Sequence, residues 1–353
     1  MRILHLHEDL SFGGGAELYL KALLTHQKAL GYRVKVLETT RVPPTRVLAA
    51  ARKADIVHLH VVYYHTSLTL LFPLVFLFPT VLTMHDVLNF CPRLDMTPPD
   101  EGLCLSPAGL HCLSRCRLSL SEADLLRHTL KRALLRRIGL ILCPSRFVVK
   151  LLRYQGFSRK RLRHLPLFLP FPEELKGTHR GRLAPPLKIL FVGRKSRPKG
   201  FDVFLEALKR LSRPFYALAV GSGKTGLLFF SQGFLRLCPS VPRWALSRFY
   251  LWADVLVFPS LAPESFGFVP LEAAYLGCVP LATYPGGPED WLKEELLFER
   301  GNPSTLATKL EFFSFYPARL EILSKEVQNR VKPFIDPSPH LRALEYLYRA
   351  LCG

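Results

Sequence analysis

Residues 2–39, RILHLHEDLSFGGGAELYLKALLTHQKALGYRVKVLET, carry the pattern that decides the fold. A short apolar run is followed by a glycine turn, by Leu and Ala at helical spacing, and by a second apolar run after Gly31. This order predicts a strand, a helix and another strand. The runs DIVHLHV (55–61), PTVLTMHD (79–86) and LILCPS (140–145) continue the rhythm. We therefore expect the first half to be a parallel sheet covered by helices on both faces.

A Pro-rich, charged stretch at residues 166–186 separates this half from a second series of the same kind. Its strands are expected at LKILFVG (187–193), YALAVG (216–221), DVLVFPS (254–260) and CVPLATY (278–284). The sequence thus predicts an α/β protein with an amino-terminal domain, 1–170, and a carboxyl-terminal domain, 187–337. The helix at 338–353 is expected to pack back on the first domain. Two doubly wound, Rossmann-like domains would face a central cleft, where open α/β sheets bind ligands.

Composition narrows the functional classes. Of 353 residues, 49% are hydrophobic, which excludes a disordered chain. Lys and Arg number 48 against 28 Asp and Glu, and a net charge of +20 attracts nucleotides, acidic lipids, polyanionic sugars or nucleic acid. The first residues include acidic side chains and no signal-length apolar run, so we expect a cytoplasmic protein. The uncharged segment 67–84 is divided by Pro73 and Pro79, which predicts a buried helix and a buried strand rather than a membrane span.

The stretch from Pro263 to Asp290, PESFGFVPLEAAYLGCVPLATYPGGPED, is the first candidate site. Pro270 suits the first position of a helix, which would leave the amides of Phe268 and Val269 at the positive end of the helix dipole. A diphosphate can bind there. Glu264 and Glu272 could then accept hydroxyl pairs of a hexose and a ribose. Alternatively, Glu272 merely stabilises the first helical turn.

A second candidate is the loop in FVGRKSRPKGFDVF, residues 191–204. Arg194 and Lys199 follow a predicted strand and could neutralise charge on a departing diphosphate. The alternative is a solvated basic loop, which is our interpretation of Lys195 and Arg197. Asp202 is expected to cap the next helix.

Together these motifs resemble the retaining glycosyltransferases of family four, which have the GT-B fold. The matching residues are GGGAE (13–17), TMHD (83–86), GR followed by PKG (193–200) and E-x7-E (264–272), in the expected order over nearly the whole chain. The resemblance implies that Arg194 and Lys199 bind the donor diphosphate. It also implies that Glu264 holds the transferred sugar, with the amides around Phe266 and Gly267, and that Glu272 binds the ribose.

The same resemblance implies that His85 lies beside the sugar and the leaving group, and that Gly14 and Gly15 form a loop closing on donor and acceptor. The implied reaction moves a sugar from a nucleoside-diphosphate sugar to a saccharide or lipid-linked acceptor of the cell envelope. Configuration would be retained by front-side displacement, in which the leaving phosphate helps deprotonate the acceptor. No D-x-D occurs, so no donor-bound metal or other catalytic cofactor is expected.

The sequence leaves other functions open. A GT-B sugar phosphorylase or a nucleotide-sugar epimerase is the enzymatic alternative. A basic nucleic-acid-binding protein is the alternative from another class, but no aromatic-basic recognition motif occurs, so we expect no nucleic-acid partner. VGSGKTG (220–226) stands where the family usually has an acidic glycine turn, and Leu218 occupies the first glycine position of a Walker motif, which excludes an ATPase.

Four cysteines crowd the segment after TMHD. Cys91, Cys104, Cys112 and Cys116 fit no standard zinc finger, yet four thiolates could hold a structural zinc or an iron–sulfur centre, with His111 as a reserve ligand. Disulfides and separate buried thiols are the alternatives.

Basic residues concentrate in LLRHTLKRALLRRIG (125–139) and SRKRLRH (158–164). Leucines on one face and cations on another predict either docking on an anionic membrane surface from the cytosolic side, or a core-packed helix with a solvated cationic face. The cations are Arg127, Lys131, Arg132, Arg136, Arg137, Arg159, Lys160, Arg161 and Arg163. The histidines of HLHE and DIVHLHV are interpreted mostly as packing within buried strands.

Overall fold

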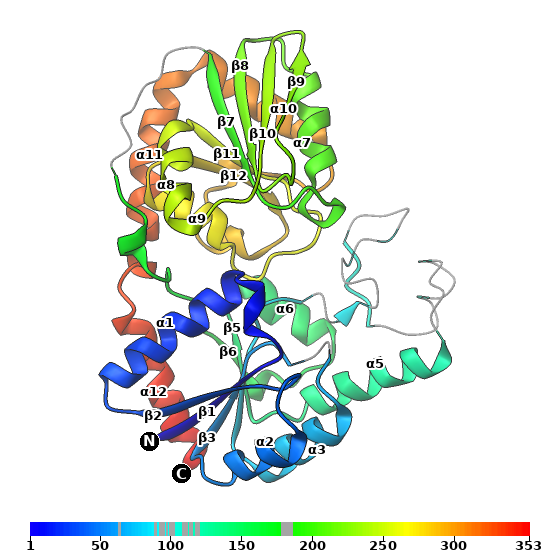
Figure 1. Cartoon of the computed structure of the whole chain (residues 1–353). Helices are drawn as coiled ribbons and strands as arrows, with labels where there is room; N and C mark the ends of the chain where they lie inside the picture. Colours follow the sequence, from blue (N-terminus) through cyan, green and yellow to red (C-terminus); the bar gives the residue numbers. More distant parts are fainter. Residues whose placement is uncertain are drawn as a thin grey trace. The chain divides into compact units, whose positions relative to one another are not determined.

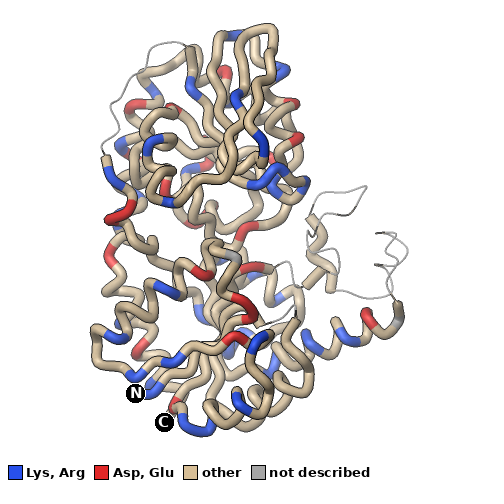
Figure 2. The backbone as a smooth tube through the Cα atoms, viewed as in Figure 1, with Lys and Arg blue, Asp and Glu red and all other residues tan. Residues whose placement is uncertain are grey.

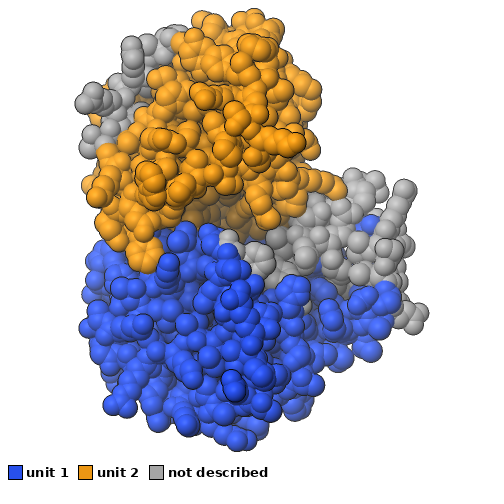
Figure 3. Space-filling view, viewed as in Figure 1, with its two compact units in different colours: residues 1–170, 336–353 blue, residues 171–335 orange. Residues whose placement is uncertain are grey.

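A computed structural model describes residues 1–62, 65–87, 90–91, 96, 98, 103–107, 112, 116, 121–177 and 186–353. The chain divides into two compact units, residues 1–170 with 336–353 (unit 1) and residues 171–335 (unit 2), shown in Figure 1 and coloured separately in Figure 3. The carboxyl-terminal helix thus belongs to unit 1, beside the amino-terminal strand.

Unit 1 is built on a six-stranded sheet in the order β2-β1-β3-β4-β5-β6. All neighbouring strands are parallel. This confirms the α/β class and the parallel sheet predicted from the alternating apolar runs. The strands are Arg2–His7 (β1), Arg33–Glu38 (β2), Ile56–Leu59 (β3), Thr80–Thr83 (β4), Leu140–Cys143 (β5) and Leu162–His164 (β6).

The alternation of leucine and histidine along β1 and β3 separates the two faces of this sheet. Leu4 and Leu6 join the main hydrophobic core, which also includes residues of α2, α3 and α6. His5 points to the other face, where residues of α1 and α12 meet it. The helices are Gly15–Ala29 (α1), Pro44–Ala51 (α2), Leu68–Leu77 (α3), Glu122–Leu135 (α5), Arg146–Tyr154 (α6) and Ser338–Cys352 (α12).

Helix α3 corrects one expectation, because it is only half buried. Leu70, Leu71 and Leu74 pack into the core. Phe72, Phe76 and Leu77 on its other face are 58%, 51% and 71% exposed. A helix that packs on one side of a sheet buries only the face that is turned to the sheet, even when its opposite face is also apolar. The strand that follows, β4, is buried as predicted. Among the described residues, no helix combines the length and apolar character needed to cross a bilayer.

Unit 2 carries a seven-stranded sheet in the order β13-β12-β11-β7-β8-β10-β9. The edge strand β9 runs antiparallel to β10, which corrects the expectation of an all-parallel sheet. The GSGK segment therefore joins two strands instead of leading into a helix, so it lacks the context of a phosphate loop. The strands are Leu187–Val192 (β7), Phe215–Val220 (β8), Gly226–Phe230 (β9), Gly233–Cys238 (β10), Val255–Phe258 (β11), Val279–Tyr284 (β12) and Leu297–Glu299 (β13).

Helices cover both faces of the unit 2 sheet, with α7 and α10 on one face and α8, α9 and α11 on the other (Figure 1). β7 and β11 are parallel neighbours, so the loops after them leave the same edge of the sheet. This register brings residues 193–200 and 259–267 together. The helices are Phe201–Lys209 (α7), Arg243–Trp252 (α8), Phe268–Tyr275 (α9), Pro303–Phe315 (α10) and Pro317–Val331 (α11).

Candidate functional site

The two loops that leave β7 and β11 meet through a charged pair. Lys199 Nζ lies 2.7 Å from Glu264 Oε1. Ser260 Oγ donates to the same carboxylate oxygen at 3.0 Å. Both members of the ion pair remain partly exposed, so a ligand can compete for them. The structure thus joins two residues that lie 65 positions apart in the sequence.

Close backbone contacts hold these loops in register. The amide of Ala262 donates to the carbonyl of Pro198 at 3.0 Å. Gly200 has φ +67, and a Cβ added there would lie 1.8 Å from the carbonyl oxygen of Pro259. Only glycine fits this position, because it accepts the left-handed backbone and has no side chain to strike the neighbouring loop.

Arg300 holds the loop after β11 in place through hydrogen bonds to backbone carbonyls. Its guanidinium donates to the carbonyl oxygens of Ser260, Leu261 and Pro285. Burial lowers its pKa to about 10, while Glu264 acts in the opposite direction, so the side chain remains cationic at neutral pH. Arg300 is not among the site residues predicted from the sequence.

Helix α9 begins a few residues after Glu264, at the end of the loop that follows β11. Gly267 is the N-cap with φ +91, and Phe268 is the first helical residue. Pro270 therefore occupies the third position, not the first as we expected. The amides of Phe268 and Val269 have no acceptor within the helix and lie at its positive end. The structure thus has a helix start at these residues, and anion binding there stays a prediction.

The loop between Glu264 and α9 is fixed from its inner side. The amide of Gly287 donates to the carbonyl of Glu264 at 2.8 Å. Trp291 Nε1 donates to the carbonyl of Phe266 at 3.4 Å, and the Phe266 side chain is buried against Phe268. The buried ring of Phe266, a predicted site residue, thus anchors the loop, and the backbone of Phe266 is part of the loop.

Glu272 has a different set of partners from Glu264. Its Oε1 accepts from Arg243 Nε at 2.9 Å, and its Oε2 accepts from the Tyr250 hydroxyl at 2.9 Å. The residue is buried, and burial raises the pKa of its carboxyl, with Arg243 opposing that shift. Arg243 also reaches Glu174 at 3.0 Å. Glu272 lies beyond the first helical turn, so the alternative of a simple first-turn electrostatic role is wrong.

Arg194 and its neighbours are exposed in the loop after β7. Arg194 makes no hydrogen bond or ion pair with other described residues. Lys195 Nζ lies 5.4 Å from the centre of the Phe201 ring. Asp202 falls in the first turn of α7, where the N-cap is Gly200, so the capping role expected of Asp202 is wrong.

In unit 1, Gly14 is the N-cap of α1 and Gly15 is its first residue. Glu17 Oε1 in that first turn lies 3.2 Å from His7 Nε2 at the end of β1. His85, two residues beyond β4, is half-buried, and its Nε2 lies 3.0 Å from His60 Nδ1. Burial lowers the pKa of His85 to about 3, so its imidazole is neutral at physiological pH.

The metal site predicted for the four cysteines is not tested by the structure. The structure holds all eight as thiols. Among the described residues, the group of three or more potential ligands close enough to share an ion is His5, His58 and His60, and it includes no cysteine. His111 lies outside the described residues. The zinc or iron–sulfur centre therefore stays a prediction, which elemental analysis of protein prepared without chelators would test.

The basic segments of unit 1 do not form one open cationic face. Lys131 is buried, and Arg136 and Arg161 donate to backbone carbonyls. Two leucines of α5, Leu126 and Leu130, are exposed. The predicted separation of leucines from cations is therefore wrong in part. The cations that remain exposed are Arg127, Arg137, Arg159, Lys160 and Arg163. Figure 2 marks the positions of Lys and Arg along the backbone in blue.

Acidification is expected to destabilise unit 1 through its buried histidines. Burial lowers the pKa of His5 to about 4, whereas histidine in an unfolded chain has a pKa of about 6.5. The unfolded state then binds protons that the folded state does not, so stability present above pH 6.5 is lost as the pH falls. Each pH unit below 6.5 removes up to about 1.4 kcal/mol per histidine. Urea unfolding at pH 7 and 5.5 should show a weaker pH dependence for His5→Leu, and an unchanged dependence would contradict this account.

Known structures share this fold over the whole chain. Sucrose-phosphate synthase from Thermosynechococcus elongatus is 18% identical, with a TM-score of 0.73 and 99% of each chain covered. HepE from Anabaena, solved with UDP-glucose, is 16% identical, with a TM-score of 0.70 and coverage of 99% of this chain and 100% of HepE. The catalytic domain of starch synthase IV from Arabidopsis thaliana, bound to ADP and acarbose, is 13% identical, with a TM-score of 0.65 and coverage of 100% and 99%.

These likenesses show that the chain has the GT-B fold, and one part of the chain is a glycosyltransferase domain. Residues 186–313 match the family model described as Glycosyl transferases group 1, so this part of unit 2 is a domain of that family. It contains β7, the Arg194–Lys199 loop, Glu264 and the start of α9. No curated protein matches the chain.

Proposed function

We propose that the protein transfers a sugar from a nucleoside-diphosphate sugar to a carbohydrate or lipid-linked acceptor with retention of configuration. The observation that carries the proposal is the pair formed by Lys199 and Glu264 beside the start of α9, within the group 1 domain. The cation is Lys199, the carboxylate is Glu264, and the two backbone donors are the amides at the start of α9, which begins four residues after Glu264. This combination suits a diphosphate joined to a polyhydroxylated sugar.

In this proposal the diphosphate binds at the amides of Phe268 and Val269, where the helix dipole favours negative charge. Lys199 and Arg194 neutralise the charge that grows on the diphosphate as it leaves. Glu264 accepts hydrogen bonds from hydroxyls of the transferred sugar and keeps Lys199 in place until the donor arrives. Loss of the mutual ion pair is offset by these two new contacts.

Glu272 is proposed to bind the ribose of the donor. Arg243 and Tyr250 each occupy one lone pair of a carboxylate oxygen, and each oxygen retains a second one. The two partners hold the carboxylate in one orientation before the ribose binds. Preorganisation of this kind lowers the entropic cost of binding.

The chemical step needs no nucleophile from the protein. The acceptor oxygen attacks the anomeric carbon on the face that the diphosphate leaves, and the bond from that carbon to the diphosphate oxygen breaks. The proton of the acceptor hydroxyl moves to an oxygen of the leaving phosphate. Charge stabilisation by Arg194 and Lys199 takes the place of a metal ion at the donor.

Binding of nucleotides tests the proposal. HepE was solved with UDP-glucose and starch synthase IV with ADP, so uridine and adenosine diphosphates are the first candidates, followed by guanosine diphosphate. We expect one of them to raise the melting temperature of the protein in the presence of EDTA, because a ligand that binds only the folded state stabilises it. No shift with any of the three at millimolar concentration would reject a nucleotide-sugar donor.

A lipid-linked acceptor would require unit 1 to reach a membrane surface. Helices α3 and α5 pack together, both expose apolar side chains, and α5 also exposes Arg127. Aromatic and leucine side chains can enter the interface while cations attract anionic headgroups. The apolar members are Phe72, Phe76, Leu77, Leu126 and Leu130. We therefore propose a peripheral association of this surface with anionic membranes.

Liposome flotation tests this association. Wild-type protein should float with anionic vesicles, less so as salt rises, because the attraction decays within a Debye length of about 8 Å at physiological ionic strength. Phe72→Ser with Phe76→Ser should reduce the floated fraction. Phe229→Ser, on an exposed edge strand of unit 2, is the matched control and should leave flotation unchanged. Equal recovery with neutral and anionic vesicles, or binding indifferent to salt, would reject electrostatic docking.

A further inference from the structure

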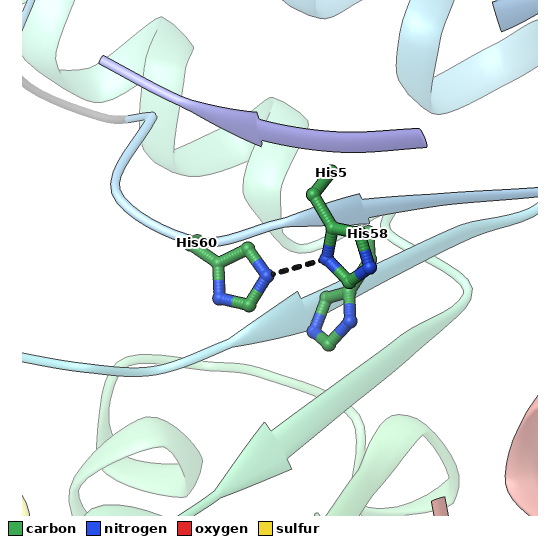
Figure 4. Close-up of side chains that lie close together, drawn as sticks. All are labelled: His5, His58 and His60. Carbon is green, nitrogen blue, oxygen red and sulfur yellow. Dashed lines mark hydrogen bonds between the residues drawn. The ribbon is translucent and has the colours of Figure 1, made fainter. Parts of the chain in front are cut away.

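The buried histidines of unit 1 form a group that the donor site does not explain. His5, His58 and His60 lie on the face of the sheet opposite the main hydrophobic core, and all three are buried (Figure 4). Leucines fill the other face of the same strands, so packing alone does not require imidazoles here. Three polar rings at fully buried positions therefore call for specific partners.

The register of the parallel sheet brings these three rings together. His5 on β1 is paired directly with His58 on β3. His60 follows at the end of β3, where its amide still donates to the carbonyl of Leu6 on β1 at 2.9 Å, so its side chain points to the same face as that of His58. The ring of His5 lies 5.2 Å from that of His58 and 5.3 Å from that of His60, measured between centroids. Neighbouring central strands thus fix the three backbone positions, which is the setting in which side chains are held most precisely.

The spacing of the ring nitrogens is close to that of ligands on one metal ion. One nitrogen from each ring lies within 4.8 Å of one nitrogen from each of the other two. His5 Nδ1 and His60 Nε2 are 3.0 Å apart. Two ligands of a tetrahedral zinc ion, each at about 2.0–2.1 Å from the metal, lie about 3.3–3.4 Å from one another. The contact between His5 and His60 is therefore only slightly shorter than zinc requires, and His58 has to turn toward this pair.

The three rings are neutral at physiological pH, so each has a lone pair to offer. Burial lowers the pKa of His5 to about 4, and it lowers the pKa values of His58 and His60 well below the usual value. A metal ion binds only an unprotonated nitrogen, so protons compete weakly for this group. Imidazole nitrogens suit zinc, and three histidines are one of the ligand sets that hold zinc in proteins.

The side chains behind the rings match the outer shell that metal-binding histidines need. Such a histidine generally donates its other N–H to an oxygen, which fixes the orientation of the ring. Gln27 Oε1 lies 2.8 Å from His5 Nε2, which places the proton of His5 on Nε2 and its lone pair on Nδ1. His58 has a hydroxyl at each nitrogen, with Thr83 Oγ1 2.7 Å from Nε2 and the Tyr348 hydroxyl 2.5 Å from Nδ1. Because a hydroxyl can donate or accept, either nitrogen of His58 can bind an ion while the other keeps a partner.

We propose that His5, His58 and His60 bind a structural zinc ion, which ties β1 to β3 within unit 1. The ion takes the place of the proton between His5 Nδ1 and His60 Nε2, and His60 then carries its own proton on Nδ1, 3.0 Å from His85 Nε2. The Tyr348 hydroxyl, which lies beside His58, is the fourth ligand. Since Tyr348 belongs to α12, the ion also anchors the last helix to unit 1. This site does not depend on the proposed function.

Hydrogen bonds alone are the competing explanation of the group. They form a hydrogen-bonded path from β4 through α12 and α1 to the three histidines, in which neutral rings satisfy one another. The two explanations differ in what lies between His5 Nδ1 and His60 Nε2, which is a proton in one case and an ion in the other. The contacts of the hydrogen-bonded path are His58 Nε2 with Thr83 Oγ1 at 2.7 Å, His58 Nδ1 with the Tyr348 hydroxyl at 2.5 Å, Gln27 Nε2 with the Tyr348 hydroxyl at 3.4 Å, Gln27 Oε1 with His5 Nε2 at 2.8 Å and His5 Nδ1 with His60 Nε2 at 3.0 Å.

The zinc content and the atoms around the zinc test the proposal. Cys112→Ser protein, produced with added zinc and purified without chelator, removes the separate site predicted for the four cysteines. Elemental analysis should find about one zinc per chain, and X-ray absorption should show nitrogen or oxygen neighbours at about 2.0–2.1 Å without sulfur at about 2.3 Å. His60→Leu in the same background should lower the zinc content about tenfold, because it removes one of three protein ligands. His340→Leu, which removes another buried and hydrogen-bonded histidine of unit 1, is the matched control and should leave the content unchanged.

Several results would overturn the proposal. Wild-type protein without zinc would do so whatever the variants show, and would leave the hydrogen-bonded path as the explanation. Zinc that remains in folded His60→Leu protein would show that these histidines do not bind it. If His60→Leu fails to fold, sulfur neighbours in the X-ray absorption of Cys112→Ser protein reject the site, and nitrogen or oxygen neighbours alone support it. If Cys112→Ser fails to fold, the wild type decides by comparison with His60→Leu, which should lose about one zinc per chain.

Discussion

Replacing Arg194 by alanine is expected to lower kcat by about 10²–10³, because a charge that stabilises the departing diphosphate is worth about 2.7–4 kcal/mol in the transition state. Arg194 is exposed and makes no hydrogen bond or ion pair with other described residues. Its loss should therefore leave the free energy of unfolding nearly unchanged. Steady-state kinetics with the donor found by nucleotide screening, together with urea unfolding, measures both quantities.

The control for this experiment comes from the same loop. Arg197 is also exposed, carries the same charge, and has no role in the proposed chemistry. Arg197→Ala should change kcat less than about twofold, which separates a specific contact from the general positive field. Equal losses in the two variants would mean that only the net charge of the loop matters, and no loss in either would remove the loop from the mechanism.

Replacing Glu272 by alanine is expected to destabilise unit 2 by about 3–5 kcal/mol, because it leaves Arg243, whose side chain is only 11% exposed, without its closest carboxylate. It also removes the acceptor of the Tyr250 hydroxyl. Glu272→Gln keeps an acceptor for one of the two donors and should cost less. Urea unfolding of the variants gives the free energies, and nucleotide binding should weaken in the variants that remain folded.

A double-variant cycle isolates the pair itself. In the Arg243→Met background, Glu272→Met should cost much less than it does in wild type, because the unpaired charge has already been removed. Additive costs in the cycle would show that the two side chains act independently, and that Glu272 contributes to stability only through packing.

The fold could be predicted because its signals are local. Apolar runs of strand length alternate with helical periodicity along both halves, and each predicted strand from RILHLH to CVPLATY is present. The antiparallel edge could not be foreseen, since β9 and β10 carry the same kind of apolar residues that parallel strands do. The exposed face of α3 was missed for a related reason, because hydrophobicity around the whole helix hides which face points inward.

The candidate site was predictable only where its residues belong to one contiguous motif. Glu264 and the start of α9 follow from a single stretch, and the pairing of Lys199 with Glu264 follows from the adjacency of β7 and β11. Arg300 and Arg243 could not be found in this way, because their carbonyl and carboxylate partners lie far along the chain. An arginine that pairs within the fold carries no sequence pattern that distinguishes it from a solvated one.

The buried histidines also have partners that could not be predicted from the sequence. Their alternation with leucine correctly predicts that β1 and β3 are buried, but the interpretation as packing leaves out the hydrogen bonds that these buried imidazoles make. The hydrogen-bonded path needs Gln27 from α1 and Tyr348 from the last helix, and nothing in either segment marks these residues in advance. Side-chain networks of this kind emerge only when distant elements are brought together.

Retaining transfer from a nucleoside-diphosphate sugar without a donor-bound metal can be read from the configuration of the released sugar. Proton NMR can follow the anomeric signal while the enzyme slowly transfers the sugar of an α-linked donor to water in the presence of EDTA. We expect the α-anomer to appear first and to mutarotate afterwards. Initial appearance of the β-anomer, turnover that requires a divalent ion, or formation of an epimerised nucleotide in place of free sugar would contradict it.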